Sequence, residues 1–212
     1  MNDRPSPSPG SRQEGYELSY KLARQQLAEI GDLEELCHRS GARYVSADKI
    51  ALDYLNQQYQ IALPEVEISL ADGEGEVPLK DRILILHYLT RAKGTQASGK
   101  LITYKQIPGG SSYFGAFSQR AIAPLVRRFG PDPDSLLGAA ARLGGCESDH
   151  GDVSVTINAF PRVPITLVLW RGDDEIAANG SVLFDAGVSD YLSTEDVAVV
   201  TETIVWKLVK GI

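Results

Sequence analysis

Apolar residues in the first part of the chain follow a helical period. From Tyr16 to Ile30 they recur at steps of three and four, which places them on one face of a helix. A second, shorter helix is expected from Leu33 to Cys37, and it is followed by Gly41, a residue type that often ends helices. The sequence therefore predicts two consecutive helices before its first strand.

The spacing of the apolar residues then falls to two. Apolar and polar residues alternate in the segments 50–54 and 59–63, with Asn56-Gln57 between them as a turn, and this pattern is typical of a β-hairpin. A third strand is expected at 66–70. The run 82–89 is apolar on almost every side, so it predicts a helix that its neighbours cover on more than one face.

The middle of the chain is predicted to be mainly helical. After a short strand within 99–104, a helix is expected from Phe117 to Phe129, and another around 136–143. Pro124 lies inside the longer helical pattern. Because proline lacks a backbone N–H, it indicates a kink or a fresh start near Ala123.

The last third is predicted to consist mostly of strands. They are expected at 153–157, 165–170 and 182–184, and the almost continuously apolar second one is typical of a central strand. Ser193 to Asp196 is a capping sequence for a C-terminal helix. Together the elements predict an α+β fold, with an antiparallel sheet packed against several helices, a helical N-terminal segment and a C-terminal helix.

Length and composition favour one domain. The chain has 212 residues, of which 43% are hydrophobic, enough to bury a substantial core. We expect a single domain over 14–212. Residues 1–13 carry three prolines among serines and are expected to form a disordered tail, because they cannot bury enough apolar surface to offset the entropy of ordering. With neither a secretory signal nor an apolar run of about 20 residues, the sequence predicts a cytoplasmic protein without a membrane span.

Charge and cysteine content exclude several classes of function. The 21 basic residues are outnumbered by 28 acidic ones, which gives a formal net charge of −7 and argues against sequence-independent binding of nucleic acid. The two cysteines, Cys37 and Cys146, lie far apart in the sequence. Without a Cys-x-x-Cys pair, a zinc ribbon, a thioredoxin-type redox pair and an iron–sulfur cluster held by this chain alone are disfavoured.

The most distinctive stretch runs from Asn158 to Glu175. It gathers Arg162, Trp170, Asp174 and Glu175 around one predicted strand. Arginine can hold a carboxylate or phosphate through its planar fork, tryptophan can stack on a flat ligand, and the carboxylates could bind a cation or serve as acid and base. The alternative is structural: a strand with a core tryptophan that ends in a solvated acidic turn.

Two further groups are candidates for ligand binding. His87 lies within the apolar helix, where it is either a hydrogen-bonded core residue or a proton shuttle or ligand. Gly109, Gly110 and Tyr113 belong to a loop that precedes a helix, and such loops can present backbone N–H groups to an anion. The same composition is common in plain loops. No set of residues predicts a metal site.

No established catalytic motif is present. The sequence contains neither nucleotide-binding fingerprint, and no Gly-x-Ser-x-Gly elbow supports a serine nucleophile. It identifies no cofactor. The leading hypothesis is a binding or accessory domain that recognises a small anionic or planar ligand, or a metalloenzyme partner. The alternative is an enzyme that uses carboxylate or histidine acid–base chemistry near the turn from Trp170 to Glu175.

Four groups of segments are distinctive in combination: Glu76–Leu89, Tyr104–Gly110 with Tyr113 and Phe117, Phe160–Pro164 into Trp170, and Leu183–Asp185 with Tyr191–Asp196. Together they resemble an uncharacterised prokaryotic family, domain of unknown function 3786, and the resemblance covers about residues 15–210.

The resemblance implies little about chemistry. It brings no assigned reaction and no catalytic residues to this chain. Similar domains occur largely in anaerobic bacteria and archaea, and some are joined to an iron–sulfur domain like that of corrinoid proteins. This chain lacks the corresponding cysteine cluster. A corrinoid-related role, implied by the family alone, would therefore place that cofactor on a partner.

Overall fold

The fold begins with a helix that starts earlier than expected. The computed structural model describes residues 9–73 and 75–212. Helix α1 (Pro9–Ala28) includes residues 9–13, which were expected to belong to a disordered tail, and the rest of that tail, 1–8, lies outside the described residues. Proline suits the first helical position, because its φ is already helical and its missing N–H would have had no partner there.

A four-stranded antiparallel sheet follows the first two helices. Its strands occur in the order β1-β2-β3-β4, and the hairpin of β2 and β3 confirms the alternating pattern. The turn is Leu55-Asn56, one residue earlier than expected, and both residues have positive φ. A two-residue hairpin turn of this hand matches the twist of the strands. The strands are β1 (Arg43–Ser46), β2 (Lys49–Tyr54), β3 (Gln57–Ala62) and β4 (Glu67–Leu70).

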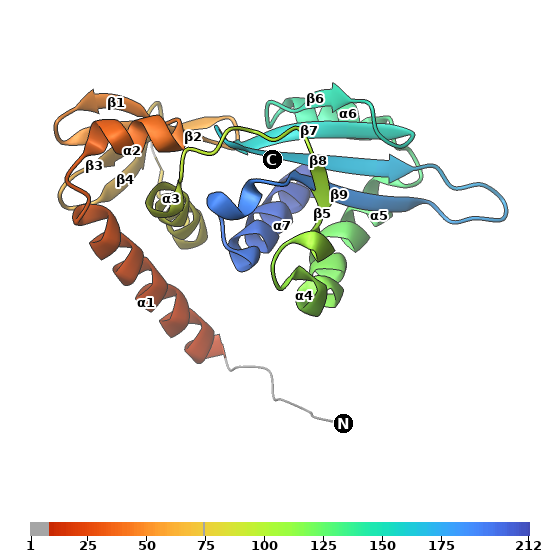
Figure 1. Ribbon diagram of the computed structural model, residues 1–212. Helices are drawn as coiled ribbons and strands as arrows, with labels where there is room; N and C mark the ends of the chain where they lie inside the picture. The colour runs from red at the N-terminus through yellow and green to blue at the C-terminus, as the bar shows by residue number, and fades with distance from the viewer. Residues whose placement is uncertain (1–8, 74) are drawn as a thin grey trace.

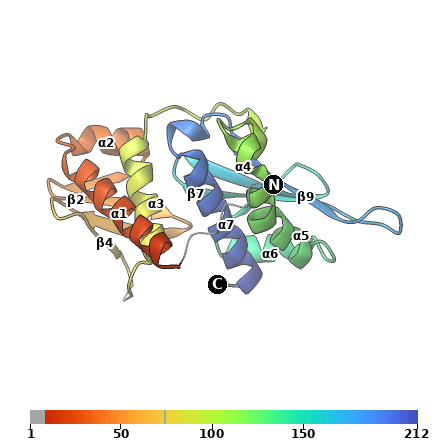
Figure 2. The same cartoon turned by 90° about the horizontal axis from the view of Figure 1, so that it is seen from below.

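Two more helices accompany this sheet. Helix α2 (Leu33–Ser40) is capped by Asp32, whose carboxylate accepts from a backbone N–H, and ends at Gly41 in the left-handed conformation, as expected. Helix α3 (Leu79–Arg91) is buried over most of its surface, which confirms the pattern of its apolar run. Helix α1 packs alongside α3, and both views show the pair beside the sheet (Figures 1 and 2).

The second sheet has five antiparallel strands in the order β5-β9-β8-β7-β6. The sequence indicated one sheet, whereas the chain forms two. They are joined where the turn between β2 and β3 meets the end of β7, by a hydrogen bond of 3.1 Å from Leu55 N–H to the Ala159 carbonyl. Strand β8 is buried along nearly its whole length, as its continuous apolar run predicted. The strands are β5 (Leu101–Thr103), β6 (Cys146–Ser148), β7 (Val153–Phe160), β8 (Val163–Trp170) and β9 (Asn179–Asp185).

Helices cover this second sheet (Figure 1). A continuous helical stretch runs through α4, a π-helical turn and α5. The expected irregularity near Ala123 takes the form of the π turn, which ends just before Pro124, and the helix does not break there. Its beginning at Gly110, rather than Phe117, was not expected. The helices are α4 (Gly110–Phe117), the π turn (Ser118–Ile122), α5 (Ala123–Phe129), α6 (Ser135–Ala141) and α7 (Thr194–Lys210), with short 3-10 turns at Tyr104–Gln106 and Val188–Asp190.

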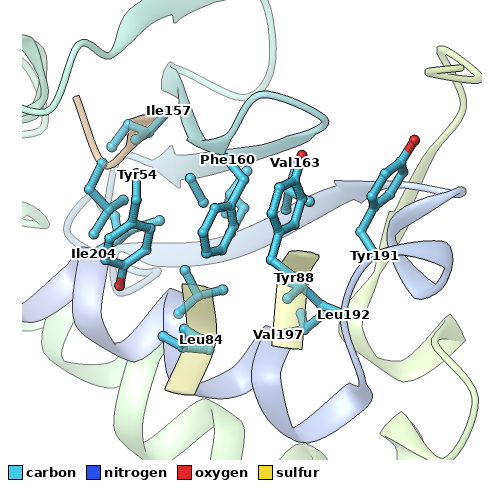
Figure 3. Packing of buried hydrophobic residues seen from close by; sticks show 14 of the residues in the cluster. Tyr54, Leu84, Tyr88, Ile157, Phe160, Val163, Tyr191, Leu192, Val197 and Ile204 are labelled. Carbon is cyan, nitrogen blue, oxygen red and sulfur yellow. The ribbon is translucent and has the colours of Figure 1, made fainter. Parts of the chain in front are cut away.

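A row of aromatic rings joins the two halves of the molecule. Phe160 of β7 stacks on Tyr88 of α3, with ring centroids 4.2 Å apart, and on Tyr54 of β2, at 4.8 Å. Tyr191 extends the row beyond Tyr88, as Figure 3 shows. One hydrophobic core cluster therefore runs through both sheets. The arrangement of helices with two antiparallel sheets confirms the α+β class. None of the described helices is both long and apolar enough to cross a membrane.

Candidate functional site

Arg162 and Trp170 lie at opposite ends of β8. Eight residues of extended chain separate them, which is about 26 Å. Arg162 occupies the turn between β7 and β8, where its backbone N–H donates to the Tyr88 hydroxyl at 3.2 Å and its guanidinium donates to the Gln96 side chain, also at 3.2 Å. The structure therefore does not bring the arginine into one site with the tryptophan and the acidic turn.

The acidic turn belongs to a hairpin that projects from the body of the molecule (Figure 1). Trp170 is 40% exposed, and Asp174 and Glu175 are exposed beyond it. Asp173 accepts hydrogen bonds from the backbone N–H groups of Glu175 and Ile176, at 2.9 and 2.7 Å, and these bonds lower the pKa of its carboxyl. This carboxylate shapes the turn, as aspartate commonly does.

The glycines of the Pro108–Phe114 segment have roles in the fold. Gly109 adopts a positive φ of 77° just before α4. A Cβ at Gly110 would lie 1.9 Å from the Tyr104 carbonyl oxygen, so only glycine fits there. Tyr113 is on α4 and 66% exposed. The segment expected to be a loop is thus largely the first turn of a helix, and its glycines allow a close backbone contact.

His87, a candidate from the sequence, has hydrogen-bond partners at both of its ring nitrogens. Its Nδ1 lies 2.8 Å from Asp196 Oδ1, and its Nε2 lies 3.3 Å from Ser19 Oγ. The other oxygen of Asp196 accepts from the backbone N–H and hydroxyl of Ser193, which caps α7. Burial raises the pKa of Asp196, but the hydrogen bonds from His87 and Ser193 outweigh it, so the pKa lies below its ordinary value.

A cavity lies elsewhere, at the N-terminal sheet. It has a volume of about 400 Å³ and is bounded by α1, the beginning of α3 and strands β2 to β4. Volumes of about 300–1,000 Å³ are usual for small-molecule sites. None of the residues singled out in the sequence lines it. Its polar lining consists of Tyr20, Arg24, Lys49, Gln60, Glu67, Ser69 and Arg82.

This cavity is positively charged in a protein that is negative overall. Arg24, Lys49 and Arg82 face a single acid, Glu67, whereas the whole chain has a net charge of −7. Arg82 also contacts the exposed Glu76, at 3.1 Å. The guanidinium of Arg24 donates to the backbone carbonyl of Glu65, and the Nε atoms of Arg24 and Arg82 are buried without a hydrogen-bond partner among the described residues.

The wall of the cavity includes a strained residue. Val66 is buried and has φ of 56°, a conformation that β-branched residues rarely adopt. Its neighbour Glu65 is the residue whose carbonyl Arg24 binds. Strain of this kind costs about 1–3 kcal/mol and concentrates at ligand-binding segments. The loop before β4 is thus held in an unusual shape where it borders the cationic pocket.

Sequence reasoning missed this cavity because its residues come from five separate elements. The register of the strands brings some of the lining residues together. Lys49 pairs with Ala62, which pairs with Glu67, and Gln60 pairs with Ser69. Tyr20 and Arg24 are four residues apart and share one helix face. The sequence offered two signals, the four-residue spacing of Tyr20 and Arg24 and the alternation of polar residues along the strands. Neither signal indicates that this face of α1 lies against the N-terminal sheet.

No metal centre emerges from the described part of the chain. Within residues 9–73 and 75–212, no group of three or more His, Cys, Asp or Glu side chains is placed to hold a metal ion. Cys37 is buried and Cys146 is exposed, and each is a free thiol.

Comparison with known proteins gives one match. A family model described as domain of unknown function (DUF3786) matches residues 32–207, a region that begins after α1. No curated protein and no solved structure matches the chain.

Proposed function

The chain belongs to the family of domain of unknown function 3786, and we propose that it is a binding domain for a small anionic ligand, held in the cavity between α1 and the N-terminal sheet. The observation that carries this proposal is the cationic lining of that cavity, with Arg24, Lys49 and Arg82 against Glu67 alone.

The chemistry of the lining suits a carboxylate or a phosphate. Arginine presents its N–H groups in a planar fork that matches both anions, and the two arginines come from different helices, so they can approach a ligand from two sides. Their buried, unpartnered Nε atoms are donors that such a ligand would satisfy. Tyr20 adds an aromatic wall beside the cations.

Charge balance favours a ligand with one or two negative charges. Three cations and one carboxylate leave a net charge of about +2 in the lining. Glu67 accepts hydrogen bonds but donates none when ionised, so it favours a ligand that also carries a hydroxyl or amino group. A small hydroxylated carboxylate or a phosphate ester fits this pattern.

Isothermal titration calorimetry on the full chain tests the proposal, with inorganic phosphate, malate and citrate as probes. We expect at least one probe to bind, and Arg24→Gln and Arg82→Gln each to weaken that binding about tenfold to a hundredfold, because each removes a charged hydrogen bond worth about 1.5–3 kcal/mol. The affinity should fall as salt rises.

Arg127→Gln is the matched control, since Arg127 is exposed on α5 and does not line the cavity. It should leave the affinity unchanged. Because Arg24 also supports the loop at Glu65, Lys49→Gln provides a second test that leaves that contact intact. Absence of binding by all three probes, or equal loss in Arg127→Gln, would refute an anion site at this cavity.

A further inference from the structure

Three helices bring a serine, a histidine and an aspartate into line. Ser19 comes from α1, His87 from α3 and Asp196 from the first turn of α7. We propose that Ser19 is a nucleophile that His87 activates, and that it accepts acyl groups from activated esters with a small apolar acyl chain. This site is separate from the cavity and does not depend on anion binding there.

The connectivity follows the order that nucleophilic serine chemistry requires. The hydroxyl oxygen of Ser19 lies 3.3 Å from Nε2 of His87, and Nδ1 on the opposite side of the ring lies 2.8 Å from Asp196 Oδ1. A nucleophile, a base in hydrogen-bond reach and a third group that orients the base are the recognised elements of such a site, and the first contact is often loose without substrate. The described positions meet this requirement.

Asp196 is held so that it fixes the histidine. Its Oδ2 accepts from the Ser193 hydroxyl at 2.6 Å and from the Ser193 N–H at 3.2 Å, which leaves Oδ1 for the imidazole. An ionised carboxylate at Nδ1 favours the tautomer with its proton on that nitrogen. The lone pair of Nε2 is then free to accept the proton of Ser19.

Solvent and substrate can reach the serine side of this group. The His87 side chain is 26% exposed, and Ser19 is only half-buried, whereas Asp196 is almost fully buried behind them. Leu22 lies three residues after Ser19, on the same side of α1, and is 51% exposed. An apolar acyl chain can pack against Leu22 while its carbonyl carbon meets Ser19.

The reaction balances without a cofactor. The Ser19 oxygen adds to the ester carbonyl carbon as its proton passes to Nε2 of His87. The C–O bond to the leaving group then breaks, the leaving alcohol takes that proton, and Ser19 is left as an ester. Water, deprotonated by His87, attacks this ester, releases the carboxylic acid and restores the hydroxyl.

The position of Ser19 also sets the speed of the reaction. Ser19 lies in the middle of α1, where backbone N–H groups are already used in the helix, so this element offers no pair of donors for the developing oxyanion. A missing oxyanion donor costs about a hundredfold to a thousandfold in rate. We therefore expect stoichiometric acylation and slow turnover.

The test uses the full chain and a biotinylated fluorophosphonate, with peptide mapping by mass spectrometry. We expect the label on Ser19, none after Ser19→Ala, and labelling at least about a hundredfold slower after His87→Gln, since general base catalysis contributes about that much. Ser111→Ala, at an exposed serine on α4, should label like the unaltered chain. No label on the unaltered chain, or a label that survives Ser19→Ala, overturns the proposal.

A second variant separates activation from a structural role of the same hydrogen bonds. Ser19→Cys places a thiol beside His87, and Cys146 serves as the exposed internal reference. Alkylation by iodoacetamide at pH 7 should be at least about tenfold faster at position 19 than at Cys146, and the added His87→Gln change should abolish the difference. Equal rates at both thiols would show that the serine only ties the helices together. Ser19→Ala should leave the affinity for anions unchanged, which would show that the serine acts independently of the cavity.

Discussion

Asp81 shows how one buried group sets a pH dependence. It lies buried in the first turn of α3, and it accepts a hydrogen bond from the hydroxyl of Tyr54, on β2, at 3.1 Å. Burial raises the pKa of Asp81 more than the Tyr54 bond and the nearby lysines lower it. The folded state therefore binds the proton of this carboxyl more tightly than the unfolded chain does, in which the carboxyl has its ordinary pKa of about 3.9.

Asp81→Asn should accordingly stabilise the protein at neutral pH. The cost of the buried charge is absent below the unfolded pKa and complete above the folded pKa, at about 1.4 kcal/mol for each unit of the shift. The amide oxygen can still accept from Tyr54. Urea unfolding should show a higher midpoint for the variant at pH 7 and equal midpoints near pH 3. A gain that persists at pH 3 would mean that charge is not its cause.

At the residue scale, the sequence could indicate a candidate residue but not the residues that contact it. His87 stood out in the sequence as a polar residue in an apolar helix. Ser19 and Asp196 lie 68 and 109 positions away from it, and nothing in the sequence linked either of them to His87. The sequence analysis did not single out Arg24 or Arg82 as candidate site residues. Chemistry that depends on residues from different helices is fixed by packing, and periodicity does not report packing.

At the scale of elements, strong local signals agreed with the structure and weak ones did not. The capping sequence at Ser193 and the apolar run of β8 gave the right elements. The predicted start, at Phe117, of the helical stretch that begins with α4 was wrong. Glycine and serine disfavour helices in isolation, but the close approach of Gly110 to Tyr104 overrides that preference. The split into two sheets was missed, since strand pairing between distant segments leaves no local pattern.

The cap of α7 gives an element-scale prediction. Ser193 accepts from the Asp196 N–H at 3.1 Å, and Asp196 bonds back to it, so Ser193→Ala should lower the free energy of unfolding by about 1 kcal/mol. Ser193→Thr, which retains the hydroxyl, should restore most of it. Chemical denaturation measures both changes. Equal losses in the two variants would contradict a capping role.

At the scale of the molecule, the stacked rings of Tyr54, Phe160 and Tyr88 connect the two sheets. Other contacts between the sheets are few, whereas each sheet is continuous within itself. Cooperative unfolding of the whole chain therefore depends strongly on this stack.

Phe160→Ala should cost about 3–5 kcal/mol and should also separate the unfolding of the two halves. Both tryptophans, Trp170 and Trp206, lie in the C-terminal half, so their fluorescence follows that half while far-UV circular dichroism follows the whole chain. The two midpoints should coincide in the unaltered chain and differ in the variant. Leu125→Ala, which empties a buried position in α5, is the control and should leave them coincident. Coincident midpoints in both variants would show that the stack does not couple the halves.

Helix α1 supplies Arg24 to the cavity and Ser19 to the histidine, yet it precedes the region that the family model matches, 32–207. Both proposed activities therefore depend on one short segment that lies outside the matched region. Replacing this helix in the chain would remove the Ser19 hydroxyl and the Arg24 cation together, while the pair of His87 and Asp196 would stay. Exchange of this one helix would thus change the proposed ligand binding and the proposed reactivity together, on a scaffold that is otherwise the same.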